Sequence, residues 1–208
     1  MNKNKSNEIV NILKEIITNP KPELDFKNNY ELITAVILSA QTTDKKVNMV
    51  TKELFLKYPD YNALGMANVD DVIAIIKPLG LANNKAKSII NMAKMVNEEY
   101  NGILPNTIEG LTKLPGVGRK TASVVLALGF NIPAMPVDTH LHRMAIRLGY
   151  INDGDDVLKA EEAYKKYLPR NMWIEAHHLF LLFGRYHCKS QNPECDGCKL
   201  SKYCKKTK

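Results

Sequence analysis

All four cysteines of the chain lie in one short stretch, CKSQNPECDGCKLSKYC, with the spacing C-x6-C-x2-C-x5-C. No secretion signal is recognisable, so we expect Cys188, Cys195, Cys198 and Cys204 to bind a metal centre rather than form disulfides. Zinc and an iron-sulfur cluster both accept four thiolates. Structural zinc usually recruits two close pairs of cysteines, and only Cys195 and Cys198 form one. The spacing therefore favours an iron-sulfur cluster and leaves zinc open.

A second stretch with possible chemistry is LTKLPGVGRKTASVVLALGF, residues 111–130. Pro115 cannot continue a helix, and we expect Gly116 and Gly118 to adopt backbone conformations closed to other residues and to expose their amides. A second helix then begins near Arg119, and its positive end favours an anion. These features predict that the turn contacts a phosphate of a nucleic-acid backbone. Such a contact does not depend on the base sequence.

The sequence of this turn allows two other interpretations. The letters GRKT resemble the end of a nucleotide phosphate-binding loop, but the pattern G-x-x-x-x-G-K-[ST] is not met. The turn could also simply link two packed helices, with Arg119 and Lys120 solvated. The glycine turn alone leaves this structural interpretation open.

The charge balance favours a polyanionic partner. The 208 residues include 29 Lys and Arg against 22 Asp and Glu, a formal net charge of +7. Solvated surface lysines are the alternative explanation of this excess. No stretch approaches the ~20 apolar residues of a membrane span, so we expect a soluble, cytoplasmic protein.

Helices must position these residues, because apolar residues recur at helical spacing and no alternating strand pattern occurs. The spacing is clearest in three sets: Ile9, Ile12, Leu13, Ile16 and Ile17; Ile89, Ile90, Met92, Ala93 and Val96; and Leu141, Met144, Ala145 and Leu148. Breaks at residues 19–23 and 131–140 predict two helical domains with a cleft between them. One domain spans 22–132 and contains a helix-hairpin-helix at about 107–128, and the other combines 1–21 with 133–208, including the cysteine loop 188–204.

Within the expected hairpin, Thr107 is a candidate N-cap of the first helix. The second helix should bury Val124, Val125 and Leu128.

Four motifs together resemble the endonuclease III family of helix-hairpin-helix DNA glycosylases. They are LSAQTTD at 38–44, LPGVGRKTASVVL from 114, VDTH at 137–140, and the cysteine pattern. The resemblance runs from about residue 8 to 204 and implies an all-α, two-lobe fold whose C-terminal loop holds a 4Fe-4S cluster. It also implies binding of damaged double-stranded DNA, removal of oxidised pyrimidines, and strand cleavage 3′ to the abasic site by β-elimination.

The resemblance assigns catalysis to Lys120 and Asp138. Breaking an N-glycosidic bond builds positive charge on the sugar, which a carboxylate stabilises, while an amine can capture C1′ as a Schiff base. A free lysine has a pKa of ~10.4, so this amine must become partly neutral through desolvation or a positive neighbour such as a helix N-terminus. Asp138 precedes a periodic helix from Thr139, so it is also a candidate N-cap.

Other residues are expected to contact DNA. Gln41 and Leu81 match the glutamine and the apolar wedge with which the family fills the gap left by a flipped nucleotide. The remaining expected contacts are Gly116, Val117, Gly118, Arg119, His140 and Lys189. Lys189 is the only basic residue between the first two cysteines and faces Glu194, so we expect its contribution to be small.

Two alternative functions stay open at this stage. A monofunctional adenine or thymine mismatch glycosylase would carry another residue at position 120, and the adenine-removing type has a glutamate where we align Ala35. A DNA-binding module without catalysis would have no need of the Lys120 and Asp138 pair. We expect a monomer that works on the nucleoid of a bacterial or archaeal cell.

Overall fold

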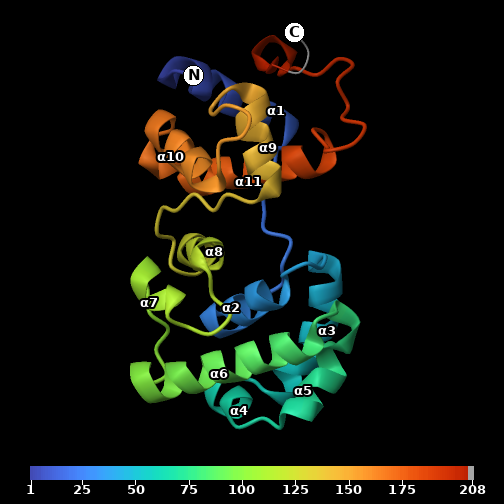
Figure 1. The fold of residues 1–208 in the computed structure, drawn as a ribbon, viewed down its shortest axis with the longest axis vertical. Coiled ribbons are helices and arrows are strands. Elements are labelled where there is room, and N and C mark those ends of the chain that lie inside the picture. The colour runs from blue at the N-terminus through green and yellow to red at the C-terminus, as the bar shows by residue number, and fades with distance from the viewer. Residues whose placement is uncertain (206–208) are drawn as a thin grey trace. The chain divides into compact units, whose positions relative to one another are not determined.

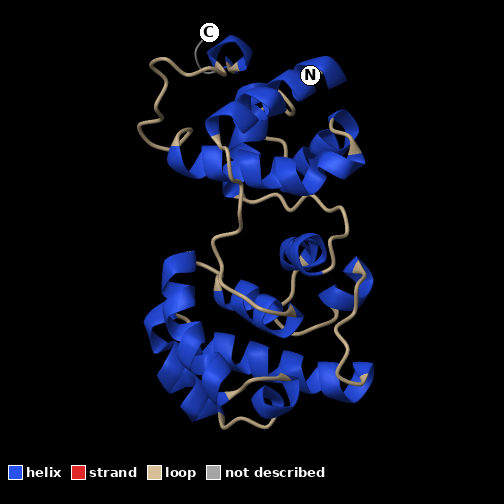
Figure 2. Cartoon of the chain, turned by 180° about the vertical axis from the view of Figure 1, so that it is seen from behind, coloured by secondary structure: helices blue, strands red, loops and turns tan. Residues whose placement is uncertain are grey.

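The computed structural model describes residues 1–205. It divides into two compact units, a hairpin unit, Pro22–Ile132, and a cysteine unit, Met1–Lys21 with Pro133–Lys208. The regular elements of the described residues are all helices, and Figure 2 shows no strand among them. The expected all-α class is therefore confirmed.

The hairpin unit is built around α2 (Asn29–Leu38), whose sequence NYELITAVIL is apolar on every side and is buried from Leu32 to Leu38. Helices α3, α6 and α8 pack against it, and α4 and α5 pack against the long helix α6 (Figure 1). The other elements of this unit are α3 (Asp44–Lys57), α4 (Tyr61–Gly65), α5 (Val69–Ile76), η1 (Lys77–Leu79), α6 (Ala82–Tyr100), α7 (Ile108–Thr112) and α8 (Arg119–Gly129).

The cysteine unit encloses its own apolar core. Its elements are α1 (Lys3–Ile16), α9 (Thr139–Leu148), α10 (Val157–Tyr167), η2 (Arg170–Met172), α11 (Trp173–Tyr186) and η3 (Ser201–Tyr203). Helix α11 packs against α1 and α9. At the centre, the hydroxyl of the fully buried Tyr164 donates a hydrogen bond to the Leu141 carbonyl at 2.9 Å.

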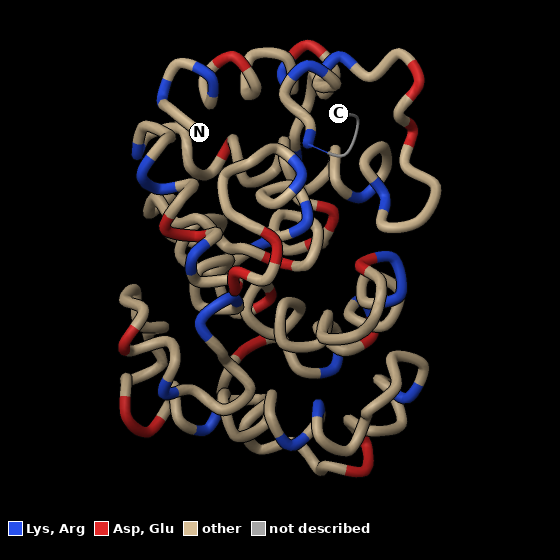
Figure 3. The backbone as a smooth tube through the Cα atoms, turned by 45° about the horizontal axis from the view of Figure 1, so that its top comes forward, with Lys and Arg blue, Asp and Glu red and all other residues tan. Residues whose placement is uncertain are grey.

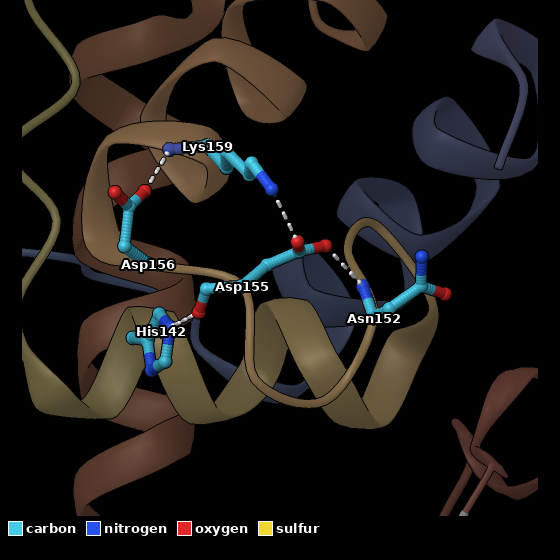
Figure 4. Close-up of polar contacts among 5 residues, drawn as sticks. All are labelled: His142, Asn152, Asp155, Asp156 and Lys159. Atoms are coloured by element: carbon cyan, nitrogen blue, oxygen red, sulfur yellow. Dashed lines mark hydrogen bonds and ion pairs between the residues drawn. The ribbon is translucent and has the colours of Figure 1, made fainter.

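The turn between α9 and α10 is fixed by a polar network around Asp155 (Figure 4). Its carboxylate accepts bonds from the Asn152 N–H at 2.9 Å and the Lys159 ammonium at 2.7 Å. Its carbonyl lies 2.7 Å from His142 Nε2 on α9. Asp156 caps α10 by accepting from the Lys159 N–H. These bonds tie both ends of the turn to the helices that it joins.

Most α-helices of the described residues begin at a polar side chain that accepts a bond from a first-turn amide. These caps are Asn2 (α1), Asn28 (α2), Thr43 (α3), Asp60 (α4), Asn68 (α5), Thr107 (α7), Asp138 (α9) and Asp156 (α10). Helices α6, α8 and α11 begin without one.

The periodic patterns predict two of the three core faces fully. The sets in α6 and α9 are buried as expected. In α1, Ile9 and Leu13 are buried, whereas Ile12, Ile16 and the following residue Ile17 are half-buried at the margin of the core.

The expectation for α8 is correct only for Val125. Val124 and Leu128 are half-buried, and the buried face instead includes Ala122 and Leu126. The buried face of α8 thus lies at other positions than the spacing predicts, and α8 packs against α2.

Charged residues are distributed over both units, with lysine and arginine interspersed with carboxylates along the tube of Figure 3. Within the described residues, no helix has the length and apolar character that a membrane span requires.

Candidate functional site

The expected helix-hairpin-helix is present as α7, a six-residue turn and α8. Thr107 caps α7 by accepting a bond from the Gly110 N–H at 3.1 Å, as its position predicts. Helix α7 ends at Thr112, and α8 begins at Arg119 and packs against α7.

The first glycine of the turn is required by the fold. Gly116 has a φ of 78°, in the left-handed region that favours glycine. A Cβ there would lie 2.8 Å from Ser88 Cβ and 3.2 Å from Ile37 Cγ2. Gly116 therefore lets the turn lie directly against α6 and α2.

The prediction for Gly118 was wrong about the backbone. Its φ is −87° and its ψ 175°, an extended conformation that any residue adopts. An added Cβ would meet no atom within 4 Å. The space beside Gly118 is open, so a glycine here leaves the start of α8 uncovered, where an anion can approach the amides closely.

Val117 lies between the two glycines and differs from them. Its side chain is buried, and its N–H donates to the Leu114 carbonyl at 3.1 Å. The exposed Gly116 and Gly118 make no amide hydrogen bond within the described residues. Val117 thus anchors the turn, while the two glycines offer donors to a ligand.

Lys120 lies in the first turn of α8 with an exposed side chain and makes no ion pair within the described residues. Arg119 beside it is also exposed. Two cations at the positive end of a helix destabilise it slightly. They also produce the local positive potential that attracts a phosphate. The hairpin unit thus leaves the Lys120 side chain exposed to solvent.

Gln41 and Leu81 share an uncommon backbone conformation. Their φ values are 55° and 53°, and the other non-glycine residues with positive φ in the described part of the chain are all asparagine. Asparagine tolerates this region, whereas glutamine and leucine are strained there, and such strain clusters at functional sites. Leu81 is also 55% exposed, at the edge of a surface hollow that includes Lys77 and Asn84.

In the cysteine unit, Asp138 caps α9 as predicted. Its Oδ1 accepts bonds from the His140 and Leu141 N–H groups, both at 2.9 Å. Within the described residues, Oδ2 accepts no hydrogen bond, and the side chain is half-buried. One oxygen is fixed by the helix, and the other remains available to a substrate.

The segment before Asp138 is held by a contact that the sequence did not reveal. His177 of α11 is buried, and its Nδ1 lies 2.8 Å from the Pro136 carbonyl. This contact fixes the chain just before the capping carboxylate.

Two arginines that sequence reasoning missed bind the start of the cysteine loop. Arg143 donates to the Cys188 carbonyl at 3.0 Å and to the Gly184 carbonyl at 2.6 Å, and its Nη2 lies 3.2 Å from His140 Nδ1. Burial lowers the pKa of Arg143, and the neighbouring charge of Arg147 adds to this effect. His140, expected to contact a phosphate, thus already has an arginine partner.

Arg147 reaches the first cysteine directly. Its Nη1 lies 3.1 Å from Cys188 Sγ and 3.0 Å from the Cys188 carbonyl, and it donates to the Lys189 carbonyl at 2.8 Å. The i, i+4 spacing of Arg143 and Arg147 places both on one face of α9. That spacing was the only sequence signal for these contacts.

The four cysteines are half-buried, and no disulfide joins them in the described residues. The pKa of Cys198 is raised, and burial is the largest cause. The charges of Cys188, Cys204 and Cys195 raise it further, so the four thiols lie near one another. Among the described residues, no three potential ligands converge on a point where a single ion would lie.

Lys189 is engaged within its own loop. Its ammonium lies 2.8 Å from Glu194 Oε1, and His187 Nδ1 lies 3.3 Å from the other oxygen of the same carboxylate. Glu194 thus opposes the cation, as expected from the sequence.

Comparisons with known proteins agree with these features. Residues 34–170 match the family described as HhH-GPD superfamily base excision DNA repair protein. Endonuclease III of Bacillus subtilis is 46% identical over 186 residues, 88% of this chain and 84% of that protein. Endonuclease III of Escherichia coli K12 is 39% identical over 204 residues, 98% of this chain and 96% of that protein.

Solved structures are also similar. A trapped endonuclease III–DNA covalent intermediate matches with a TM-score of 0.96 and 39% identity, over 100% of this chain and 97% of that one. A thermostable thymine-DNA glycosylase matches with a TM-score of 0.87 and 23% identity over 98% and 97% of the two chains, which shows a common fold only. From the family match and the two relatives, the chain belongs to the endonuclease III family of HhH-GPD base excision DNA repair proteins.

Proposed function

We propose that this protein is a bifunctional DNA glycosylase and abasic-site lyase that removes oxidised pyrimidines in base excision repair. The observation that carries the proposal is Lys120, an exposed amine at the uncapped start of α8, in a chain of the endonuclease III family. A structural relative that forms a trapped covalent intermediate with DNA supports an amine nucleophile.

In this mechanism the Lys120 amine attacks C1′ of the damaged nucleotide, the glycosidic bond breaks, and the departing base takes up a proton. The C1′–O4′ bond of the sugar ring then opens and O4′ takes up a proton, which leaves an iminium between the Lys120 nitrogen and C1′. Loss of a C2′ proton from this iminium is followed by breakage of the C3′–O bond, and the 3′ phosphate leaves. Oδ2 of Asp138 faces the positive charge that develops on the sugar. Because Oδ1 is fixed by the α9 amides, the carboxylate needs no reorientation.

DNA binding and base exposure use other parts of the hairpin unit. The Gly116 and Gly118 amides and the positive end of α8 hold a backbone phosphate, and Arg119 adds charge. Leu81 inserts between base pairs and Gln41 fills the vacated position. Their left-handed backbone keeps both side chains outside the core.

The cysteine loop fits a 4Fe-4S cluster better than a single zinc ion. Structural zinc usually recruits two close pairs of cysteines, and only Cys195 and Cys198 form one. A cluster takes one thiolate per iron, so its four cysteines lie further apart than four cysteines around a single zinc ion. Cys188, Cys195, Cys198 and Cys204 would hold it, and Arg147 would donate to the Cys188 sulfur. A cluster held by these four thiolates would cross-link the loop at four positions.

Trapping by borohydride tests the nucleophile. The protein should form a covalent adduct with an abasic or thymine glycol duplex, and peptide mapping should place it on Lys120 rather than on the N-terminal amine. Lys120→Ala should abolish trapping and retain much of the DNA binding, because the hairpin amides belong to the backbone. The matched control is Lys113→Ala, an exposed lysine of the same hairpin, which should trap normally. Trapping of Lys120→Ala at another internal lysine would contradict the assignment.

Substitution of Asp138 separates catalysis from helix capping. Asp138→Asn should slow base removal by about two to three orders of magnitude, the effect of losing one transition-state charge partner. Its melting temperature and lesion binding should be retained, because asparagine is also a good N-cap. Asp138→Ala should in addition cost about 1 kcal/mol of stability, measured by thermal melting. A near-normal rate for Asp138→Asn would remove the electrostatic role.

The two glycines of the turn provide a matched pair. Gly118→Ala should leave the melting temperature unchanged and weaken binding to undamaged duplex on the order of tenfold, because the new Cβ occupies the phosphate approach. Gly116→Ala should destabilise the fold by about 1–3 kcal/mol, because its φ is left-handed and its Cβ meets Ser88. For both variants, binding to duplex DNA should weaken steeply as the salt concentration rises. Unchanged affinity of Gly118→Ala would place the phosphate elsewhere.

The metal centre is tested by composition and colour. Protein purified without oxygen should be yellow-brown and contain about four irons per chain. Cys198→Ser should lose both the colour and the iron. One zinc per chain with no visible absorbance would exclude the cluster.

A further inference from the structure

A buried lysine that the proposed mechanism does not use lies next to Leu81. Lys85 in α6 is 5% exposed and is the only buried lysine or arginine of the described residues. The Lys85 ammonium donates to the Leu79 carbonyl at 3.2 Å. Lys85 makes no ion pair among the described residues. A buried lysine whose partner is one carbonyl is uncommon, since buried charges are normally paired.

Lys85 bonds to the residue before a two-residue turn and to the second residue of that turn. The turn consists of Gly80 and Leu81, with φ values of 69° and 53°. The Lys85 side chain binds the carbonyl of Leu79, which precedes the turn, and the Lys85 N–H donates to the carbonyl of Leu81 at 3.0 Å. The left-handed pair is therefore held at both ends by one residue.

This arrangement opposes local stability in several ways. Burial lowers the pKa of Lys85, because the charged form loses hydration. The cation lies near the positive end of α6, where a negative charge is favoured. Leu81 occupies a conformation that is strained for leucine, and its side chain is 55% exposed. A turn that only had to connect η1 to α6 would be less strained with an asparagine at 81.

We propose that Lys85 is a positioning residue that holds the Gly80–Leu81 turn left-handed, so that the Leu81 side chain stays exposed and oriented for insertion into the duplex. The inference rests on the proposed function and goes beyond it by naming the group that maintains the wedge. The Leu79 carbonyl is buried with its residue, so loss of the ammonium leaves it without this partner and the turn relaxes.

The test compares a lesion that must be flipped with one that is already open. The probes are an abasic site in a fully paired duplex and the same site in an unpaired internal loop, both assayed by single-turnover cleavage. Lys85→Met retains the length and burial of the side chain and removes the donor. The duplex-to-loop rate ratio should fall about ten- to a hundredfold, the effect of one buried charged hydrogen bond. The ratio is internal to each variant, so a loss of folded protein cancels.

Two further variants separate positioning from general effects. Lys87→Met removes the same charge from an exposed position of α6 and should keep the wild-type ratio. Leu81→Ala should lower the ratio as Lys85→Met does, and the double variant should be no worse than Leu81→Ala alone, because Lys85 acts through Leu81. Fluorescence of 2-aminopurine next to the abasic site should show reduced unstacking for Lys85→Met.

The outcomes distinguish this inference from the function on which it rests. Additive losses in the double variant, or equal losses on both substrates, would overturn the role of Lys85 while the enzyme remains a lyase. A wild-type protein that cleaves neither substrate would instead refute the proposed function.

Discussion

Backbone amides at the start of a helix must find partners, and this requirement organises the molecule. Most helices meet it with a capping side chain, and those helices form the packed scaffold of each unit. Helices α6, α8 and α11 do not. Helix α11 continues directly from η2, whereas α6 and α8 follow glycine turns that carry the residues proposed to contact DNA. The first amides of α6 and α8 are thus ones that a polyanion could satisfy.

The two uncapped turns differ in how they remain accessible. At α8 the first amides stay accessible because Gly118 has no side chain, and the space where a Cβ would lie is open. At α6 a strained backbone at Leu81 keeps the leucine side chain exposed. The first suits a phosphate that must approach closely, and the second suits an apolar group that must project.

Local signals in the sequence predict much of this arrangement. Helical periodicity identified α9 and the core face of α6, and cap preferences identified Thr107 and Asp138, because both depend on neighbours within one turn. The backbone of Gly118 was wrongly predicted, because glycine is used both for left-handed φ and for close approach, and the letter does not say which. The contacts of Arg147 with Cys188 and of His177 with Pro136 were missed, because they join residues about forty positions apart. No local pattern reports such tertiary pairs.

The hydrogen bonds from the α9 amides to Asp138 Oδ1 have an entropic consequence. A carboxylate on a mobile side chain must give up rotational freedom at the moment when it meets the transition state. Here that freedom is lost during folding, when the helix forms, and the loss is offset by the cap itself. In the proposed catalytic role of Asp138, ordering of this carboxylate is therefore part of the folding equilibrium rather than of the activation barrier.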